Sequence, residues 1–203
     1  MNADRIMDKT QIRQIVKRAK AGDREAFTEL VHAYSDRIYN LALRILKNPD
    51  DAADVLQETF LAVYQKIHTF DGRADFFTWL YRIATNFSLM KLRKNKRTVL
   101  TDDDLESHFD NPEQIQLTEW QDRPLQGMLS EEFRRHLDEA VDSLPEIYKS
   151  VFVLRDLENL SIKETSKVLG ITESNVKIRL KRARMYLREK LAGYMKELVK
   201  ESG

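Results

Sequence analysis

Residues 161–190 read SIKETSKVLGITESNVKIRLKRARMYLREK, and this stretch decides the fold of the C-terminal part of the chain. Ser161 followed by Glu164 is a capping box, in which two side chains satisfy free backbone N–H groups at a helix start. The predicted helix ends near Gly170, because glycine readily takes the left-handed conformation that closes a helix. Thr172 can then cap a second helix. Two helices joined by so short a turn form a helix-turn-helix.

The second helix of this pair has two different faces. The apolar stripe has helical spacing and is typical of a buried face. It consists of Val176, Leu180, Ala183, Leu187 and Leu191. The basic face reflects a local bias, since residues 163–190 carry nine Lys or Arg against three Glu. A packed face beside a basic face suits a DNA major groove, where phosphates attract the cations. A solvated surface helix is the alternative, but the basic bias and the turn motif together favour DNA.

The composition limits the classes of protein to consider. The 203 residues suffice for one large or two small domains, and the chain has no cysteine for a disulfide or a thiolate metal site. The four histidines lie too far apart in sequence to indicate a metal site, and we expect neither metal nor cofactor. The N-terminus lacks the apolar core of a signal peptide, and no run approaches the ~20 apolar residues of a membrane span. We therefore expect a soluble, cytoplasmic protein.

Helical periodicity extends over most of the chain and predicts an all-α fold. In the N-terminal part, one helix should open at Gly22-Asp23 and end before Asn48, and others should span about 51–68, capped by Asp50 or Asp51, and about 75–92. A helix from about Ser130 and another from Leu144-Pro145 should pack with the helix-turn-helix as a four-helix domain. The segment between these parts is acidic, with eight acids and one base over residues 101–123. We predict two small helical domains, 1–97 and 131–203, joined by a flexible acidic linker, 98–130.

Two patterns in the N-terminal domain are candidates for function. Asp50, Asp54 and Glu58 follow one another at helical spacing, with Asp51 and Gln57 nearby, although like charges so placed repel. This stripe is either a favourable acidic helix start or a docking face for a basic partner, and spacing alone does not choose. The second pattern interleaves Phe77, Trp79 and Tyr81 with a run of six bases and no acid over residues 82–97. This pattern would suit binding to unpaired bases and phosphates. The alternative is a core helix that ends in a run of basic residues.

The order of these features resembles the extracytoplasmic-function sigma factors, small alternative sigma factors of bacterial RNA polymerase. The residues that carry the resemblance are DAADVLQETFLAVYQKI at 51–67, FDGRADFFTWLYRIATNFSLMKLRKNKR at 70–97 and LPEIYKSVFVLRDLENLSIKETSKVLGITESNVKIRLKRAR at 144–184. The similar regions cover about residues 23–97 and 131–192. The WLYRIATN run before an acidic linker and a helix-turn-helix is the most specific part.

The resemblance implies roles for the N-terminal domain, which matches the family's σ2 domain. The helix 51–67 would dock on the clamp of the polymerase's largest subunit, with Asp51, Asp54, Gln57 and Glu58 on the docking side. The loop and helix that follow would open the minus-ten promoter element, with a flipped base held by the Phe70 to Phe76 loop. The implied DNA-binding residues are Phe70, Asp71, Arg73, Phe76, Trp79, Arg82 and Asn86, with Lys91, Arg93, Lys94, Lys96 and Arg97 at phosphates.

The resemblance likewise implies that the C-terminal domain is a σ4 domain that reads the minus-thirty-five element and meets the flap of the second-largest polymerase subunit. The residues implied to contact base edges are Ser174, Asn175, Lys177, Ile178 and Lys181. Those implied to contact phosphate or to pack locally are Arg179, Arg182 and Arg184. Ile178 stands where many members carry a small polar residue, so apolar contact with a thymine methyl would replace a hydrogen bond. The linker would thread the polymerase cleft. Family members are commonly held inactive by an anti-sigma protein, so such a partner, in a stress or envelope response, is expected for an otherwise monomeric chain.

Two other classes of protein compete with this interpretation. A free-standing helix-turn-helix regulator explains residues 131–192 equally well but leaves the acidic stripe and the aromatic-basic helix without a role. An enzyme has no support, because the sequence contains no phosphate-binding glycine loop, metal cluster or nucleophile motif. The sequence therefore favours a non-catalytic subunit that gives RNA polymerase its promoter specificity.

Overall fold

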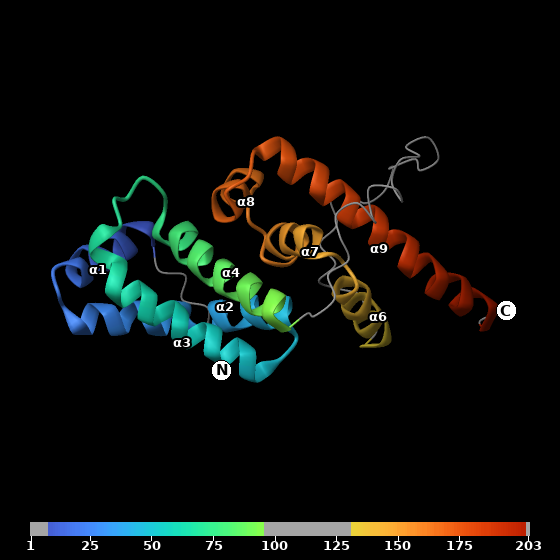
Figure 1. Cartoon of the computed structure of the whole chain (residues 1–203), viewed down its shortest axis with the longest axis horizontal. Coiled ribbons are helices and arrows are strands. Elements are labelled where there is room, and N and C mark those ends of the chain that lie inside the picture. The colour runs from blue at the N-terminus through green and yellow to red at the C-terminus, as the bar shows by residue number, and fades with distance from the viewer. Residues whose placement is uncertain (1–7, 96–130, 202–203) are drawn as a thin grey trace. The chain divides into compact units, whose positions relative to one another are not determined.

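The structure is a computed structural model that describes residues 8–95 and 131–201, with side chains described for 8–95 and 135–192 (Figure 1). All regular elements in these ranges are helices, which confirms the predicted all-α fold. In the N-terminal part these are α1 (Lys9–Lys20), α2 (Arg24–Leu46), α3 (Pro49–Lys66), a short 3₁₀ helix η1 (Ile67–Thr69) and α4 (Phe76–Asn95). The C-terminal part contains α6 (Glu131–Asp142), α7 (Glu146–Phe152), a π-helical turn η2 (Val153–Leu157), α8 (Ile162–Leu169) and α9 (Glu173–Glu201). The predicted linker, Lys96 and Arg97 lie outside the described residues.

The described residues form two compact units. The N-terminal unit contains α1 to α4 together with residues 153–173, which include η2 and α8. The C-terminal unit contains α6, α7 and α9 from Ser174 onward. Residues 153–173, which include the first helix of the predicted helix-turn-helix, thus contact the N-terminal helices.

Helix α1 is an element that the sequence analysis did not predict. Ile15, Val16 and Ala19 are buried against the N-terminal core, and the N–H of Asp8 donates to the side-chain oxygen of Gln11 at 3.2 Å. A turn with Gly22 at φ +92° leads into α2. The helix adds a basic surface to the N-terminal unit, because its exposed positions carry lysine and arginine.

The starts of α2 and α3 are fixed by side-chain caps. Asp23 accepts a hydrogen bond from the N–H of Ala26 at 3.1 Å, and this bond, followed by that from Arg18, lowers the pKa of the Asp23 carboxyl. The prediction that Asp50 or Asp51 caps α3 was wrong. The cap is Asn48, whose side-chain oxygen accepts from the N–H groups of both aspartates at 2.9 and 3.1 Å. Pro49 occupies the first turn, where its missing N–H costs nothing.

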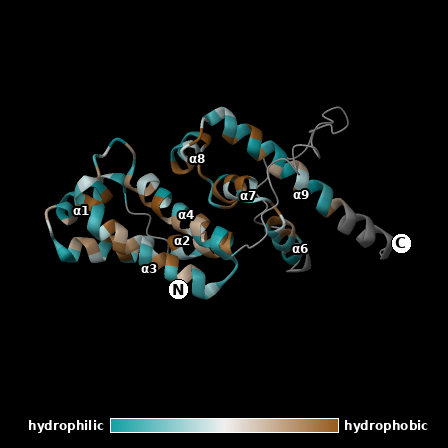
Figure 2. Ribbon diagram, viewed as in Figure 1, coloured by the Kyte–Doolittle hydropathy of each residue, from teal (hydrophilic) through white to brown (hydrophobic). Residues whose placement is uncertain are grey.

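Helices α2, α3 and α4 enclose the core of the N-terminal unit, and apolar residues line α2 and α4 where they lie together (Figure 2). Phe76, Leu80 and Ala84 of α4 are inside, and Tyr81 is inside too, with 1% of its surface exposed. Its hydroxyl donates to Glu158 at 3.0 Å, and Glu158 also pairs with Arg44. Burial raises the pKa of Tyr81 well above its ordinary value. Tyr81 is covered because residues 153–173 belong to this unit, which helical periodicity could not show.

Thr85 of α4 offers a simple test of packing inside the N-terminal unit. Its hydroxyl is buried and has no hydrogen-bond partner among the described residues. Replacement by valine, which has nearly the same shape, should raise the free energy of unfolding by about 1 kcal/mol because no polar group is then left unpaired. Urea unfolding measures the change. Thr85→Ser keeps the hydroxyl and loses the methyl group, so it should destabilise; destabilisation by valine would show that the hydroxyl is satisfied in solution.

The helix-turn-helix forms where the sequence predicted it. The N–H of Ser161 donates to Glu164 at 2.8 Å, and the N–H of Glu164 donates to the Ser161 hydroxyl at 3.1 Å. The Ser161 hydroxyl also donates to the Glu164 carboxylate at 2.6 Å, and this bond, followed by that from the Ser161 N–H, lowers the pKa of the Glu164 carboxyl. Gly170 has φ +67° and closes α8, and α9 begins at Glu173. The predicted capping box and glycine end are therefore both confirmed.

The core of the C-terminal unit joins α6, α7 and α9. The predicted apolar stripe of α9, from Val176 to Leu191, is buried along its whole length. Tyr148 and Phe152 of α7 are among the largest fully buried side chains. Buried Lys149 pairs with Asp142 at 2.7 Å, which gives its ammonium group a partner inside this core. The packing leaves the opposite side of α9 to solvent.

Candidate functional site

The loop between η1 and α4 is held at its base by aromatic rings. Phe70 lies 5.3 Å from Trp79 and 5.7 Å from Phe76, measured between ring centroids, and Phe76 and Trp79 are 5.8 Å apart. Phe76 is 5% exposed, whereas Phe70 and Trp79 are half-buried. Phe76 therefore supports the loop from within the core, and Phe70 and Trp79 are the predicted aromatic residues that a ligand can reach.

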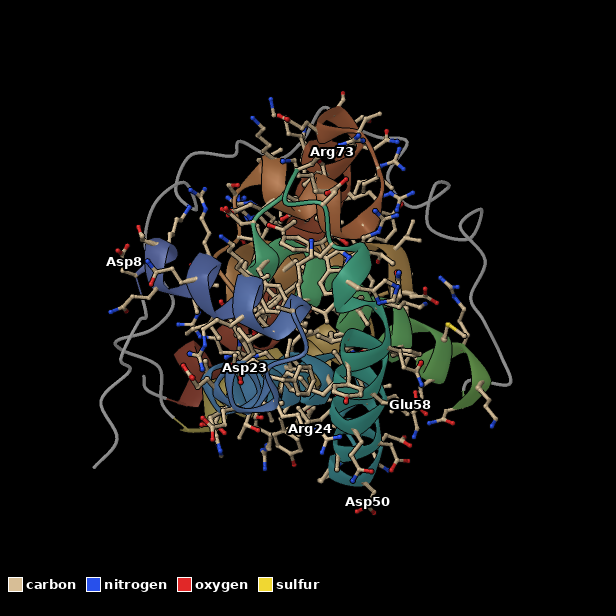
Figure 3. All side chains as sticks on the ribbon, turned by 90° about the vertical axis from the view of Figure 1, so that its left-hand side faces the viewer. Asp8, Asp23, Arg24, Asp50, Glu58 and Arg73 are labelled. Carbon is tan, nitrogen blue, oxygen red and sulfur yellow. The ribbon has the colours of Figure 1, made fainter. Side chains whose placement is uncertain are left out.

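The tip of this loop is exposed and locally ordered by polar contacts. Arg73 donates from its backbone N–H to Asp71 at 3.0 Å and from its guanidinium at 3.2 Å. Gly72 between them has φ +74°, a conformation that side chains rarely adopt. Arg73 stands at the outer end of the loop with 90% of its side chain exposed (Figure 3). A base captured at the loop would thus meet a cation, a carboxylate and two reachable rings.

The outer face of α4 presents the other predicted DNA-binding residues unevenly. Arg82, Asn86, Arg93 and Lys94 are exposed, and Met90, which the sequence analysis did not single out, is 61% exposed. Lys91 is different: only 20% of its side chain is exposed, and it pairs with carboxylates of α3. Helix α4 therefore has an exposed polar and basic face, but Lys91 is mostly buried beside α3 and contributes less to it.

The residues of the predicted docking face of α3 fall into two groups, those that contact α4 and those that do not. Lys91 Nζ lies 2.5 Å from Asp54 Oδ2 and 3.2 Å from Asp51 Oδ1, and Asn95 donates to Asp51 at 2.7 Å. The hydrogen bond to Asp54 is the main cause of the raised pKa of Lys91. Gln57 and Glu58 make no such contacts with the described residues and are exposed, as the view of Glu58 shows (Figure 3). Asp51 and Asp54 thus also join α3 to α4.

Two apolar residues on α3 complete this face and were missed from the sequence. Leu61 is 59% and Tyr64 is 53% exposed. They follow Gln57 and Glu58 at helical spacing, so all four lie on one side of the helix. The signal was present in the sequence, because neither residue fits the buried stripe that contains Phe60 and Val63. Exposed large apolar residues beside a carboxylate are typical of a protein-binding face.

The predicted DNA-binding residues of α9 fall into two groups by exposure. All five predicted base-reading residues are exposed: Ser174, Asn175, Lys177, Ile178 and Lys181. Ile178 is 49% exposed, an unusual position for a large apolar side chain. Arg179, Arg182 and Arg184 are half-buried, and Arg182 donates to the Tyr148 hydroxyl at 3.3 Å. The exposed group forms one surface near the start of α9.

Other kinds of site receive no support from the described residues. Within 8–95 and 135–192, no three His, Asp or Glu side chains converge as a metal site would require. Among the described helices none is long and apolar enough to cross a membrane. The candidate sites of this chain are therefore surfaces: the α3 face, the loop with α4, and the α9 face.

Comparison with known families places both parts of the chain. Residues 30–98 match the family model of sigma-70 region 2, and residues 134–187 match that of sigma-70 region 4. The chain is 34% identical over 180 residues to the ECF RNA polymerase sigma factor SigW of Bacillus subtilis, covering 89% of this chain and 96% of that protein. It is 33% identical over 181 residues to the ECF RNA polymerase sigma-E factor of Haemophilus influenzae, covering 89% and 95%.

Solved structures show the same fold. CnrH, in complex with the cytosolic domain of CnrY, is similar with a TM-score of 0.66 at 24% identity, covering 92% of this chain and 99% of that one. The sigma factor RpoE of Bartonella quintana, in complex with the anti-sigma factor NepR, gives a TM-score of 0.59 at 20% identity, covering 82% and 96%.

Proposed function

The chain belongs to the extracytoplasmic-function sigma factors of the sigma-70 family, and from this premise we propose which surface performs each step of promoter recognition. As a sigma factor it is a specificity subunit of RNA polymerase that directs transcription initiation at its promoters, and it is not an enzyme. The proposal assigns polymerase docking to α3, minus-ten recognition and opening to the 70–76 loop with α4, and minus-thirty-five recognition to α9.

The docking assignment rests on one observation above all, the exposed face of Gln57, Glu58, Leu61 and Tyr64. Tyr64 is held in place by the ring of Phe27, whose centroid lies 5.1 Å away at a near-perpendicular angle. A rigid aromatic ring and a leucine at the centre, with polar groups at the edge, match the anatomy of protein interfaces. The occupant is the clamp of the polymerase's largest subunit, and the flap of the second-largest subunit binds the C-terminal unit.

The DNA assignments rest on the match between exposure and chemistry. At the minus-ten element, Phe70 and Trp79 offer stacking surfaces, Asp71 and Arg73 offer polar groups, and Arg82, Asn86, Arg93 and Lys94 lie along the strand. At the minus-thirty-five element, the five exposed residues near the start of α9 meet base edges in the major groove. The half-buried arginines of α9 neutralise phosphates at the edges of this surface.

An anti-sigma factor is the third partner in this proposal. The similar structures of CnrH and RpoE were each solved with a bound protein, the cytosolic domain of CnrY and the anti-sigma factor NepR. Binding of such a protein to this chain would cover the polymerase-docking and DNA-binding surfaces until a stress or envelope signal releases it. A free-standing DNA-binding regulator is a weaker alternative, because it gives the α3 face no partner.

The test is a titration of fluorescently labelled full-length chain with bacterial core RNA polymerase at physiological salt. We expect tight one-to-one binding, and the double variant Glu58→Lys, Leu61→Ser should bind about tenfold more weakly, a loss of ~1.4 kcal/mol. A matched control, Asp36→Lys with Met90→Ser, makes the same changes at exposed positions outside the α3 face and should bind like the wild type. Equal losses in both variants, or no binding by the folded wild type, would reject the docking assignment.

A further inference from the structure

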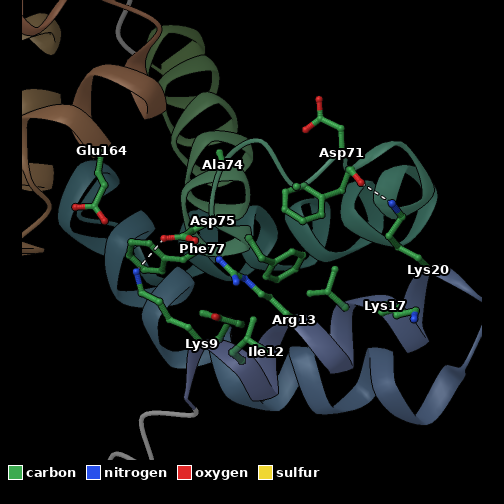
Figure 4. Close-up of a pocket in the computed structure, with 15 residues that line it drawn as sticks. Lys9, Ile12, Arg13, Lys17, Lys20, Asp71, Ala74, Asp75, Phe77 and Glu164 are labelled. Carbon is green, nitrogen blue, oxygen red and sulfur yellow. Dashed lines mark hydrogen bonds and ion pairs between the residues drawn. The ribbon is translucent and has the colours of Figure 1, made fainter.

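A pocket of about 540 Å³ lies between α1, the 70–76 loop and the start of α4 (Figure 4). One wall is formed by four basic residues of α1, and aromatic residues from α2, the loop and α4 form part of the lining. Its volume is in the range of pockets that hold small organic ligands. The sequence analysis assigned nothing to α1, and none of the surfaces proposed above includes its basic side chains.

The basic residues of α1 divide into two pairs with different surroundings. Lys9 pairs with Asp75 at 3.1 Å, and Lys20 donates to the backbone oxygen of Phe70 at 2.5 Å. These two contacts tie both ends of α1 to both ends of the loop, so the wall and the loop are held together. Arg13 and Lys17 lie between them, are exposed, and have no ionic partner among the described residues. Two unpaired cations, one helical turn apart, therefore face the pocket.

The aromatic lining gives these cations an apolar surface beside them. Phe77 packs against Tyr81 with 4.0 Å between ring centroids and lies 6.5 Å from Tyr34. Tyr34, Phe76 and Phe77 all line the pocket, and Phe77 is half-buried. An aromatic surface next to unpaired cations is the arrangement by which proteins bind single-stranded nucleic acid, with bases on rings and phosphates on cations.

The carboxylates of the pocket restrict the ligand further. Asp71, Asp75 and Glu164 also line it, and each already accepts a hydrogen bond or pairs with a cation. They disfavour a ligand that carries several negative charges deep inside, such as an acidic peptide. They can accept hydrogen bonds from the amino groups of a base. The unpaired positive charge is confined to Arg13 and Lys17, which suits one or two phosphates.

We propose that this pocket is a second nucleotide site, which takes a nucleotide of single-stranded DNA next to the base that the 70–76 loop captures. The base of this nucleotide lies against Phe77, a half-buried ring of the lining, and its phosphate binds Arg13 and Lys17. Continuity supports this occupant, because Phe70 and Phe76 belong both to the loop and to the pocket lining. The proposal rests on the proposed function of the loop, and it adds α1 to the DNA-binding surface of the N-terminal unit.

The experiment is a fluorescence anisotropy titration of a labelled single-stranded oligo(dC), whose bases each carry an amino group, with the full-length chain at several salt concentrations. Arg13→Gln with Lys17→Gln should weaken binding about tenfold and reduce the slope of log K against log salt by about 0.7, because the one phosphate that both cations hold contributes about 0.7 on single strands. The control variant Arg24→Gln with Lys66→Gln removes the same charge at exposed positions outside the pocket. It should keep nearly wild-type affinity.

Three further probes test whether binding depends on the base, on the strand or on negative charge alone. An abasic strand of the same length should bind several-fold more weakly, because the aromatic surface then has no base to stack on. A free mononucleotide and a polyglutamate peptide should each compete poorly with the oligonucleotide. Equal losses in the two variants, unchanged affinity for the abasic strand, or efficient competition by the mononucleotide or the peptide would overturn the proposal. None of these measurements requires polymerase, so they remain informative if the docking assignment fails.

Discussion

Replacing Phe76 with alanine is expected to lower the free energy of unfolding of the N-terminal unit by about 3–5 kcal/mol, the range for truncation of a buried phenylalanine. Phe76 is 5% exposed and its ring lies within 6 Å of three others, those of Tyr34, Phe70 and Trp79. Alanine would leave a cavity where the loop base, α2 and α4 meet. The substitution should also impair promoter opening, because the 70–76 loop would lose the ring that supports its base.

Urea unfolding followed by far-ultraviolet circular dichroism measures this effect, and Phe70→Ala is the matched control. Phe70 belongs to the same aromatic cluster but is half-buried, so its removal should cost clearly less stability. Phe70→Ala should instead impair promoter opening, because it removes a ring that a flipped base can reach. If the two variants lose equal stability, the cluster is not organised around Phe76 as the structure describes.

Replacing both Lys177 and Lys181 with alanine should weaken recognition of the upstream promoter element by about tenfold or more, since each specific base or phosphate contact is worth roughly 1–3 kcal/mol. Both lysines are exposed, one helical turn apart, on the side of α9 opposite its buried stripe. The slope of log K against log salt should fall by up to about 1.8 if both contact phosphate, and by less if either reads a base edge.

The measurement uses polymerase assembled with the full-length chain and duplexes selected from a random library by the wild-type complex. Lys190→Ala is the control, because Lys190 lies on the same helix but away from its start, over the ring of Tyr186 at 5.6 Å. Its removal should leave sequence preference unchanged. An unchanged preference in the double variant, across salt concentrations, would mean that α9 does not read the element through these lysines.

Features of the fold that depend on near neighbours in sequence could be predicted. The capping box of Ser161 and Glu164, the glycine end at Gly170 and the buried stripe of α9 all arise from contacts within one or two helical turns. Helix α1 was missed because its apolar positions are few and most of its residues are polar. The cap of α3 was placed two or three residues late because Asn48 and Pro49 were interpreted only as a turn.

Features of the candidate sites that depend on distant residues could not be predicted. Tyr81 is buried beside Glu158, which lies 77 residues away in sequence. The spacing of apolar residues within α4 cannot indicate a contact with so distant a residue. Lys91 and Asp54 were assigned to different partners, although they form one ion pair across 37 residues. The exposed positions of α9 were predictable because their opposite face is a clear apolar stripe.

The pairing of Lys91 with Asp51 and Asp54 has a consequence for how mutant phenotypes of this chain should be interpreted. Removing a carboxylate from α3 takes a group from the proposed docking helix and at the same time releases a cation on the helix proposed to bind the strand. We expect such a variant to bind polymerase more weakly and DNA more strongly. Transcript yield depends on both affinities, so two opposing changes could leave it nearly constant. A silent phenotype at Asp51 or Asp54 would then conceal two defects, which separate binding measurements would reveal.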